Sequence, residues 1–150
     1  MHRWLLKQEP TGYSWRDLVR EGTTSWNGVH NPLALQNLRR MAPRDVALFY
    51  HTGTERAAVG IVTVTSTPRP DPDDPRGSWT VDVRASRPLV RPVTLAELKV
   101  DPALDGFALL RLPRLSVVPV TGTEWMHILV HERTEPAAGR PEARSRRSRG

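Results

Sequence analysis

The residues best suited to binding a ligand gather between Trp26 and His51. Trp26 offers an aromatic surface shortly before Asn31 and Pro32, a pair typical of a helix start because Asn caps the first turn and Pro fits its first position. A helix start also presents backbone N–H groups that have no partner within the helix. An aromatic ring, amides and free N–H donors in one place favour a planar, polar or anionic ligand.

Sequence motifs of catalysis are scarce. The chain contains no phosphate-binding glycine loop, no dinucleotide-binding motif, no nucleophile elbow and no H-E-x-x-H zinc motif. His127 and His131 are four positions apart and could share a metal ion, but the sequence places no third ligand, so a role at a helix end is favoured. The components of a hydrolytic triad carry no local signature: Ser14, Ser116, His51 and Asp45. We therefore predict no catalytic residue, no metal site and no cofactor.

Length and composition indicate one domain with a single core. The chain has 150 residues, of which 38% are hydrophobic, and it lacks cysteine, which excludes disulfides, cysteine nucleophiles and cysteine-ligated zinc. No apolar run is long enough to cross a bilayer, and the start Met-His-Arg lacks the features of a signal peptide. We expect a monomeric, cytoplasmic protein with no membrane partner.

Basic residues are concentrated at the C-terminus. The formal net charge is +6, and residues 133–150 contribute six arginines against two glutamates, which leaves about +2 for the rest of the chain. This segment has no apolar periodicity, so we predict a disordered, arginine-rich tail at 133–150 after a folded domain at 1–132. The tail could bind phosphates in a salt-sensitive way or could be a solvated terminus, and both interpretations stay open.

Hydrophobic patterns and capping residues divide the domain into short elements. We predict strands at 3–7, 46–51, 57–67, 79–85 and 115–120, and helices between 14 and 22, at 32–41, at 95–99 and from Thr121 or Thr123 onward. Residues 107–112 fit either a helix or a strand, Gly60 indicates a bulge or a close backbone approach, and 68–77 is predicted to be a surface loop with solvated carboxylates. Strands and helices do not alternate regularly. A mixed α/β fold with a small sheet curled into a barrel and short helices at its rim is therefore favoured over a doubly wound parallel sheet.

Four segments, in order, resemble the EVE domain family. WNGVHNPLALQNLRRM at 26–41 is similar to the family signature W-D-G-V-R-N-x-x-A-R-N-x-L-R-x-M. The segments WLLKQEP at 4–10, ALFYHT at 47–52 and RLSVVPVTGTEW at 114–125 resemble W-L-x-K-S-E-P, F-F-Y-H-S and R-L-S-V-x-P-V-x-x-x-E-W. The resemblance spans roughly residues 3–130 and implies the PUA-like pseudo-β-barrel of that family.

The resemblance also implies a site, because in the family the four segments surround a pocket implicated in holding a modified nucleobase. Carried onto this chain, the site comprises Lys7, Gln8, Glu9, Pro10, Trp26, His30, Asn31, His51, Thr52, Arg114, Leu115 and Ser116. Stacking on the base is expected of Trp26, edge contacts of Asn31, Glu9 and His51, and phosphate contacts of Lys7 and Arg114.

Several positions depart from the family pattern. Gln8 and Thr52 each stand where serine is usual, and His30 stands where arginine is usual. Further departures replace an aspartate, an arginine and an asparagine at Asn27, Leu35 and Gln36. These changes alter cationic and small polar contacts, so the family pocket could be retuned or closed.

The function that we expect is a non-catalytic reader of a modified nucleobase in DNA or RNA. Two other classes stay open: a module for a small anionic metabolite or a protein partner, and a nucleotide hydrolase with Glu9 or His51 as its base. Ordinary structural roles are open as well, with Trp26 in the core, Asn31 only a cap and Arg114 in an ion pair.

Overall fold

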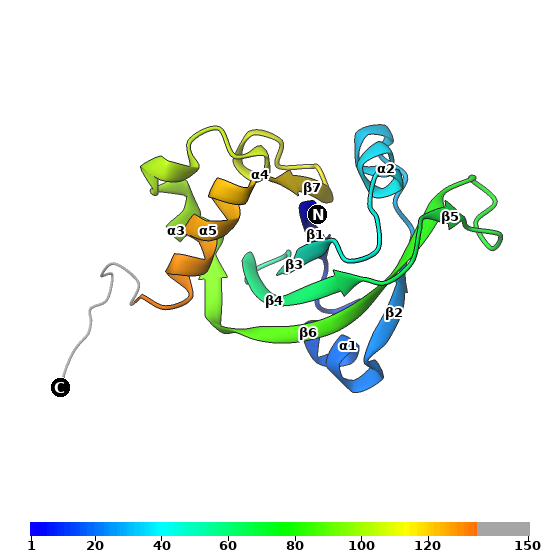
Figure 1. Ribbon diagram of the computed structural model, residues 1–150, viewed down its shortest axis with the longest axis horizontal. Coiled ribbons are helices and arrows are strands. Elements are labelled where there is room, and N and C mark those ends of the chain that lie inside the picture. Colours follow the sequence, from blue (N-terminus) through cyan, green and yellow to red (C-terminus); the bar gives the residue numbers. More distant parts are fainter. Residues whose placement is uncertain (135–150) are drawn as a thin grey trace.

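Seven strands form one curled sheet in the computed structural model, which describes residues 1–134 (Figure 1). The strands are β1 (Arg3–Gln8), β2 (Thr23–Trp26), β3 (Val46–His51), β4 (Ala57–Val64), β5 (Arg69–Pro70), β6 (Trp79–Thr94) and β7 (Val117–Val120). They run in the order β2-β6-β4-β3-β1-β7, with β5 beside β6; β1 and β3 are parallel and the other pairs antiparallel. Within residues 1–134, β2 and β7 do not pair, so the sheet curls without closing. The predicted mixed, curled sheet is confirmed.

Short helices surround the sheet at positions set by their caps (Figure 1). They are α1 (Trp15–Glu21), α2 (Pro32–Arg39), α3 (Leu95–Lys99), α4 (Ala108–Arg111) and α5 (Gly122–His131), with a 3₁₀ turn, η1, at Pro102–Leu104. Capping boxes begin α1, α3 and α5 at Ser14, Thr94 and Thr121, and the Asn31 side chain accepts the N–H of Ala34 at the start of α2. These helix starts are as predicted, and the ambiguous segment 107–112 contains a helix.

The largest difference from the predicted elements is β6, which continues to Thr94 instead of ending at Ala85. Pro88 and Pro92 argue against a strand from sequence, because proline cannot donate a ladder hydrogen bond. In the structure β2 pairs with β6 only at 81–84, so beyond that point β6 has β4 on one side, and both prolines are exposed. Strands β4 and β7 are shorter than predicted, since β4 ends at Val64 and β7 begins at Val117.

The core on one face of the sheet is built around Phe49 of β3. Its side chain is 0% exposed, and its ring meets those of Trp15 and Trp26 edge-on, with centroids 5.6 and 5.5 Å apart. Gly60 of β4 makes room for Trp15, because a Cβ atom there would lie 2.5 Å from that indole. The predicted close approach at Gly60 is confirmed, and the register of β3 with β4 also shifts beside it.

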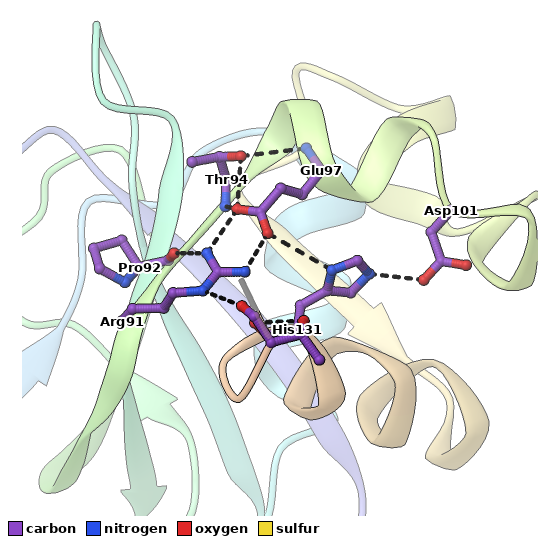
Figure 2. A network of polar contacts seen from close by, with 7 residues as sticks. Arg91, Pro92, Thr94, Glu97, Asp101 and His131 are labelled. Carbon is purple, nitrogen blue, oxygen red and sulfur yellow. Dashed lines mark hydrogen bonds and ion pairs between the residues drawn. The ribbon is translucent and has the colours of Figure 1, made fainter. Parts of the chain in front are cut away.

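A polar network joins α3 and α5 to β6 (Figure 2). Arg91 of β6 donates to both carboxylate oxygens of Glu97, which also accepts the N–H and the hydroxyl of Thr94. His131, in the last turn of α5, bonds to Asp101 at 2.8 Å and lies 3.7 Å from Glu97. This network fixes the position of α3 relative to the end of β6.

The predictions about the C-terminal tail and about membrane-spanning segments can be compared with the structure only within residues 1–134. The arginine-rich tail at 133–150 lies outside the described residues apart from 133 and 134, so its disorder and its phosphate contacts stay predictions. No helix within residues 1–134 combines the length and the apolar character that crossing a bilayer requires.

Candidate functional site

Candidate residues from two distant segments meet where β1 and β3 end. Because these strands are parallel, their carboxyl ends lie at one edge of the sheet, and Gln8 stands in register with His51. The N–H of Thr52 donates to the Gln8 carbonyl at 2.9 Å, and the Thr52 hydroxyl reaches the Glu9 carboxylate at 3.4 Å. Pro10 lies in the turn that follows Glu9. The Q-E-P and H-T segments are thus side by side.

A pocket of about 240 Å³ opens beside these strand ends. Its lining residues come from β1, from the turn before α1 and from β2 with the position after it: Gln8, Tyr13, Thr24, Ser25, Trp26 and Asn27. We call it the Gln8–Trp26 pocket. Of the predicted site residues, it contains Gln8 and Trp26. Tyr13, Thr24 and Ser25 were not predicted; the Pro10-Thr11-Gly12 turn, which brings Tyr13 back toward β1, is the signal that could have found it.

Trp26 belongs mainly to the core. Its side chain is 4% exposed, its ring packs edge-on against Phe49, and its carbonyl accepts the Thr80 hydroxyl at 3.0 Å. The indole therefore presents only a small part of its surface to the Gln8–Trp26 pocket. Thr80 of β6 is buried as well, and this hydrogen bond satisfies its hydroxyl.

His51 uses both ring nitrogens within the protein. Its Nε2 lies 3.0 Å from the backbone N–H of Trp15, and its Nδ1 lies 2.8 Å from the Glu55 carboxylate. A nitrogen that accepts an N–H carries no proton, so we assign the ring proton to Nδ1, which donates to Glu55. His51 is 8% exposed, and this geometry makes it a residue that positions the start of α1. Neither nitrogen is left for the edge contact that the sequence suggested.

The entry to α2 is tied to the proline-rich loop. His30 Nε2 lies 2.6 Å from the Asp74 carboxylate, which also accepts the Arg76 N–H at 2.8 Å and the Ser78 hydroxyl. These donors, led by the Ser78 hydroxyl, lower the pKa of Asp74 to about 2. The carboxylates of this loop were predicted to be solvated. For Asp74 that prediction is wrong, because its carboxylate is bonded to His30, a partner that the sequence did not indicate. His30 and Asn31 do not line the Gln8–Trp26 pocket.

Lys7 points to the face of β1 opposite Gln8 and bonds to the chain just before β7. Neighbouring residues of a strand point to opposite faces, so Lys7 and Gln8 cannot line one pocket side by side. The Lys7 N–H donates to the Ser116 carbonyl at 3.0 Å, and Lys7 Nζ donates to the Pro113 carbonyl at 2.8 Å. Leu115 is buried and Arg114 is exposed. Lys7 and Gln8 therefore lie on opposite faces of the sheet, and the segment 114–116 does not line the Gln8–Trp26 pocket.

The described residues contain no cluster of side chains suited to binding a metal ion. Among residues 1–134, no three His, Asp or Glu side chains are grouped in a way that could hold a metal ion. His131, weighed from sequence as one of two helical ligands, contacts Asp101 and Glu97 in the network at the end of α5.

A family model for the EVE domain matches residues 2–131, nearly all of the described chain. This chain belongs to the EVE domain family. The curled, unclosed sheet with short rim helices is the PUA-like architecture that the resemblance implied, and solved structures of the family have the same fold.

Three known proteins illustrate how similar this EVE domain is to its relatives. Thymocyte nuclear protein 1 of Mus musculus is 33% identical over 170 residues, covering 89% of this chain and 75% of the relative. The NMR structure of Rpa0253 from Rhodopseudomonas palustris has a TM-score of 0.83 at 37% identity, covering 88% and 93% of the two chains. The crystal structure of human THYN1 in complex with 5-methylcytosine containing DNA has a TM-score of 0.81 at 28% identity, covering 91% and 100%.

Proposed function

We propose that this EVE domain is a non-catalytic reader that holds a modified nucleobase of DNA in the Gln8–Trp26 pocket. The observation that carries the proposal is the similarity, over the whole domain, to human THYN1 solved with 5-methylcytosine containing DNA. Cytosine modified at its 5-position is the ligand class that this relative suggests. A base in RNA is the closest alternative ligand.

The lining of the pocket suits recognition of a base. Gln8 and Asn27 each carry an amide, which offers a donor and an acceptor side by side, as the edge of a base requires. Thr24 and Ser25 add hydroxyls, and Tyr13 adds an aromatic ring to the lining, to which Trp26 contributes the small part of its indole that is exposed. These side chains can contact the edge and the ring of a base that has left its stack.

The same lining argues against the hydrolase alternative. All six residues are neutral, and burial together with the bond from the Tyr13 hydroxyl to Glu21 raises the pKa of Tyr13, which keeps its phenol protonated. His51, one of the two bases considered, already accepts from Trp15 and donates to Glu55. A general base needs a free lone pair within reach of its substrate, and this ring offers none.

Gln8→Ala provides the most direct test. DNA 12-mers that differ only in one cytosine, unmodified, 5-methylated or 5-hydroxymethylated, are titrated against the full chain by fluorescence anisotropy, with RNA versions as a further arm. We expect one modified form to bind best, and Gln8→Ala to reduce that preference roughly tenfold, because a well-placed amide contact discriminates by about 1–3 kcal/mol.

Gln36→Ala is the matched control, since Gln36 is an exposed glutamine on α2 that does not line the pocket. It should leave both affinity and preference unchanged, and circular dichroism should report the same fold for both variants. Equal affinity for all three cytosines, or a preference that survives Gln8→Ala, would contradict the proposed pocket. Cytoplasmic location, a monomeric state and phosphate contacts by the tail remain predictions alongside this proposal.

A further inference from the structure

A second cavity, of about 300 Å³, is reached from the opposite face of β1. Gln8 lines the first pocket, and its neighbour Lys7 lines this one. The cavity lies between the ends of β1 and β3, the loop that follows β3, helices α3 and α4, and the residues before β7. Its lining comprises Lys7, Tyr50, Thr52, Gly53, Arg56, Leu95, Lys99, Leu109 and Pro113. We call it the Lys7–Lys99 cavity.

The charged residues that line this cavity are all basic, although the Glu9 carboxylate lies against Gly53 and accepts the Thr52 hydroxyl. The lining includes Lys7, Arg56 and Lys99 and no carboxylate. The chain has 22 basic residues but only two lysines, and both of them line this cavity. Within residues 1–134, none of these three cations forms an ion pair with a carboxylate. The cavity therefore gathers positive charge that no carboxylate within the described part of the chain neutralises by an ion pair.

Lys7 is the most constrained of the three cations. Its Nζ donates to the Pro113 carbonyl at 2.8 Å and lies 6.0 Å from the ring centroid of Tyr50, which is 3% exposed. An ammonium has three protons, so donors remain for a ligand. Burial lowers the pKa of Lys7, because a desolvated ammonium is unfavourable without an anion beside it. An anion in the cavity would remove that penalty.

The walls of the cavity fix the backbone at two of these cations. Arg56 has a φ of 46°, in the left-handed region that side chains seldom adopt, and its carbonyl accepts the Leu95 N–H at 2.8 Å. Such a backbone persists only where its surroundings enforce it. Lys99 lies at the end of α3, the helix that the Arg91–Glu97 pair fixes to β6 (Figure 2). The backbone positions that carry Arg56 and Lys99 are thus fixed by tethered elements, whereas the two side chains are exposed.

We propose that the Lys7–Lys99 cavity binds a phosphate group. Lysine ammoniums act as point charges that suit phosphate, and the Arg56 guanidinium can bind two of its oxygens. The phosphate can belong to a nucleic-acid backbone or to a free phosphate anion. Only the first source rests on the proposed reader function.

The two lysines allow a direct test. Reductive methylation with ¹³C-formaldehyde labels Lys7, Lys99 and the α-amino group of Met1. Dimethylated lysine keeps its positive charge, so the label still reports attraction of a phosphate by charge, although the one proton left on Lys7 is the one that the Pro113 carbonyl accepts. The labelled full chain is titrated with sodium phosphate at constant ionic strength, with sodium chloride as the reference, and followed by ¹³C NMR. We expect both lysine signals to shift along one saturable curve while the Met1 signal stays in place. An unmodified DNA 12-mer, titrated in the same way, provides the second arm.

Charge-removal variants supply the control. Lys99→Gln and Arg56→Gln should each weaken phosphate binding about tenfold, because each removes one charge-assisted hydrogen bond to the phosphate. Arg40→Gln removes the same charge from an exposed arginine that lines neither cavity, and it should leave binding unchanged. A loss shared equally by all three variants would mean that only net charge matters and would overturn the site.

The outcomes separate the sources of the ligand and the two proposals. Lysine signals that respond to DNA identify a backbone phosphate, and signals that respond to sodium phosphate alone identify the free anion. Signals that follow neither ligand beyond the chloride reference overturn the phosphate site. Failure of the reader function would instead appear as equal affinity for all three cytosines, with the response of the lysines to phosphate intact.

Discussion

Trp26 lines a pocket but contributes more to the core. Because its indole is 4% exposed and packs edge-on against Phe49, replacing it affects folding before it affects a ligand. We predict that Trp26→Ala lowers the free energy of unfolding by about 3–5 kcal/mol, the usual effect of truncating a buried large aromatic. Urea unfolding followed by circular dichroism measures this loss.

Trp79→Ala is the comparison at the same scale. Trp79 is only half-buried, and its ring packs against the Arg39 guanidinium at 4.2 Å, so its loss should reduce stability by no more than about 2 kcal/mol. Similar losses in the two variants would mean that Trp26 is not a core residue. Loss of binding in Trp26→Ala alone would therefore say little about stacking, whereas Gln8→Ala changes the pocket without changing the core.

At the scale of elements, the packing of α1 against the sheet depends on Gly60. Gly60 lies beneath Trp15, and the Trp15 N–H is held by His51, so β3 and β4 together fix the start of the helix. We predict that Gly60→Ala lowers the free energy of unfolding by about 1–3 kcal/mol, because the added methyl group would overlap the indole and push α1 outward. The midpoint of urea unfolding reports the change.

Gly12→Ala is a suitable control for this substitution. A Cβ atom at Gly12 would meet its nearest atom, the Glu9 carbonyl oxygen, at 3.5 Å, which is an ordinary contact. Its effect should stay within about 0.5 kcal/mol of zero. If Gly60→Ala changed the free energy of unfolding equally little, the indole of Trp15 would have room to move, and α1 would pack against β4 less tightly than the structure indicates.

Local signals predicted the elements well, whereas long-range pairing determined the rest. Ser14, Thr94 and Asn31 mark helix starts because a cap depends on neighbours within a few residues. The end of β6 depends on which strands lie beside Pro88 and Pro92, and no local pattern contains that information. An element's start is therefore more predictable here than its length.

The candidate site shows the same division. Of the residues predicted from sequence, Gln8 and Trp26 line one pocket and Thr52 lines the other, and their role in binding stays a prediction. Strand alternation separates Lys7 from Gln8, and this could have been foreseen from the sequence. Tyr13 reaches its pocket through a turn. Arg56 and Lys99 come together because α3 lies against the loop between β3 and β4, and only the three-dimensional arrangement supplies that information.

At the scale of the whole molecule, the carboxyl groups make the free energy of unfolding depend on pH in the acidic range. Within residues 1–134, seven carboxyl groups have a lowered pKa in the folded state: Asp17, Asp45, Asp74, Asp82, Glu97, Asp101 and Glu132. Glu97 is the clearest case, because burial opposes its ionisation yet Arg91 and Thr94 lower its pKa from 4.5 to about 2. Between these values the unfolded chain takes up a proton that the folded chain does not, so stability falls as the pH falls.

We predict that the free energy of unfolding is steady above pH 5 and decreases between about pH 4.5 and 2, the range in which carboxyls with lowered pKa values titrate on unfolding. Glu97→Gln should flatten this decrease by on the order of 1–2 kcal/mol, a value reduced for solvent screening. Urea unfolding at pH 6, 5, 4 and 3 measures the slope. Glu124 holds the same capping position in α5 but forms no ion pair within residues 1–134, so Glu124→Gln should keep the original slope. An unchanged slope in Glu97→Gln would mean that other carboxyl groups cause the acid sensitivity. It would also mean that the Arg91–Glu97 ion pair does not hold α3, one wall of the Lys7–Lys99 cavity, in place.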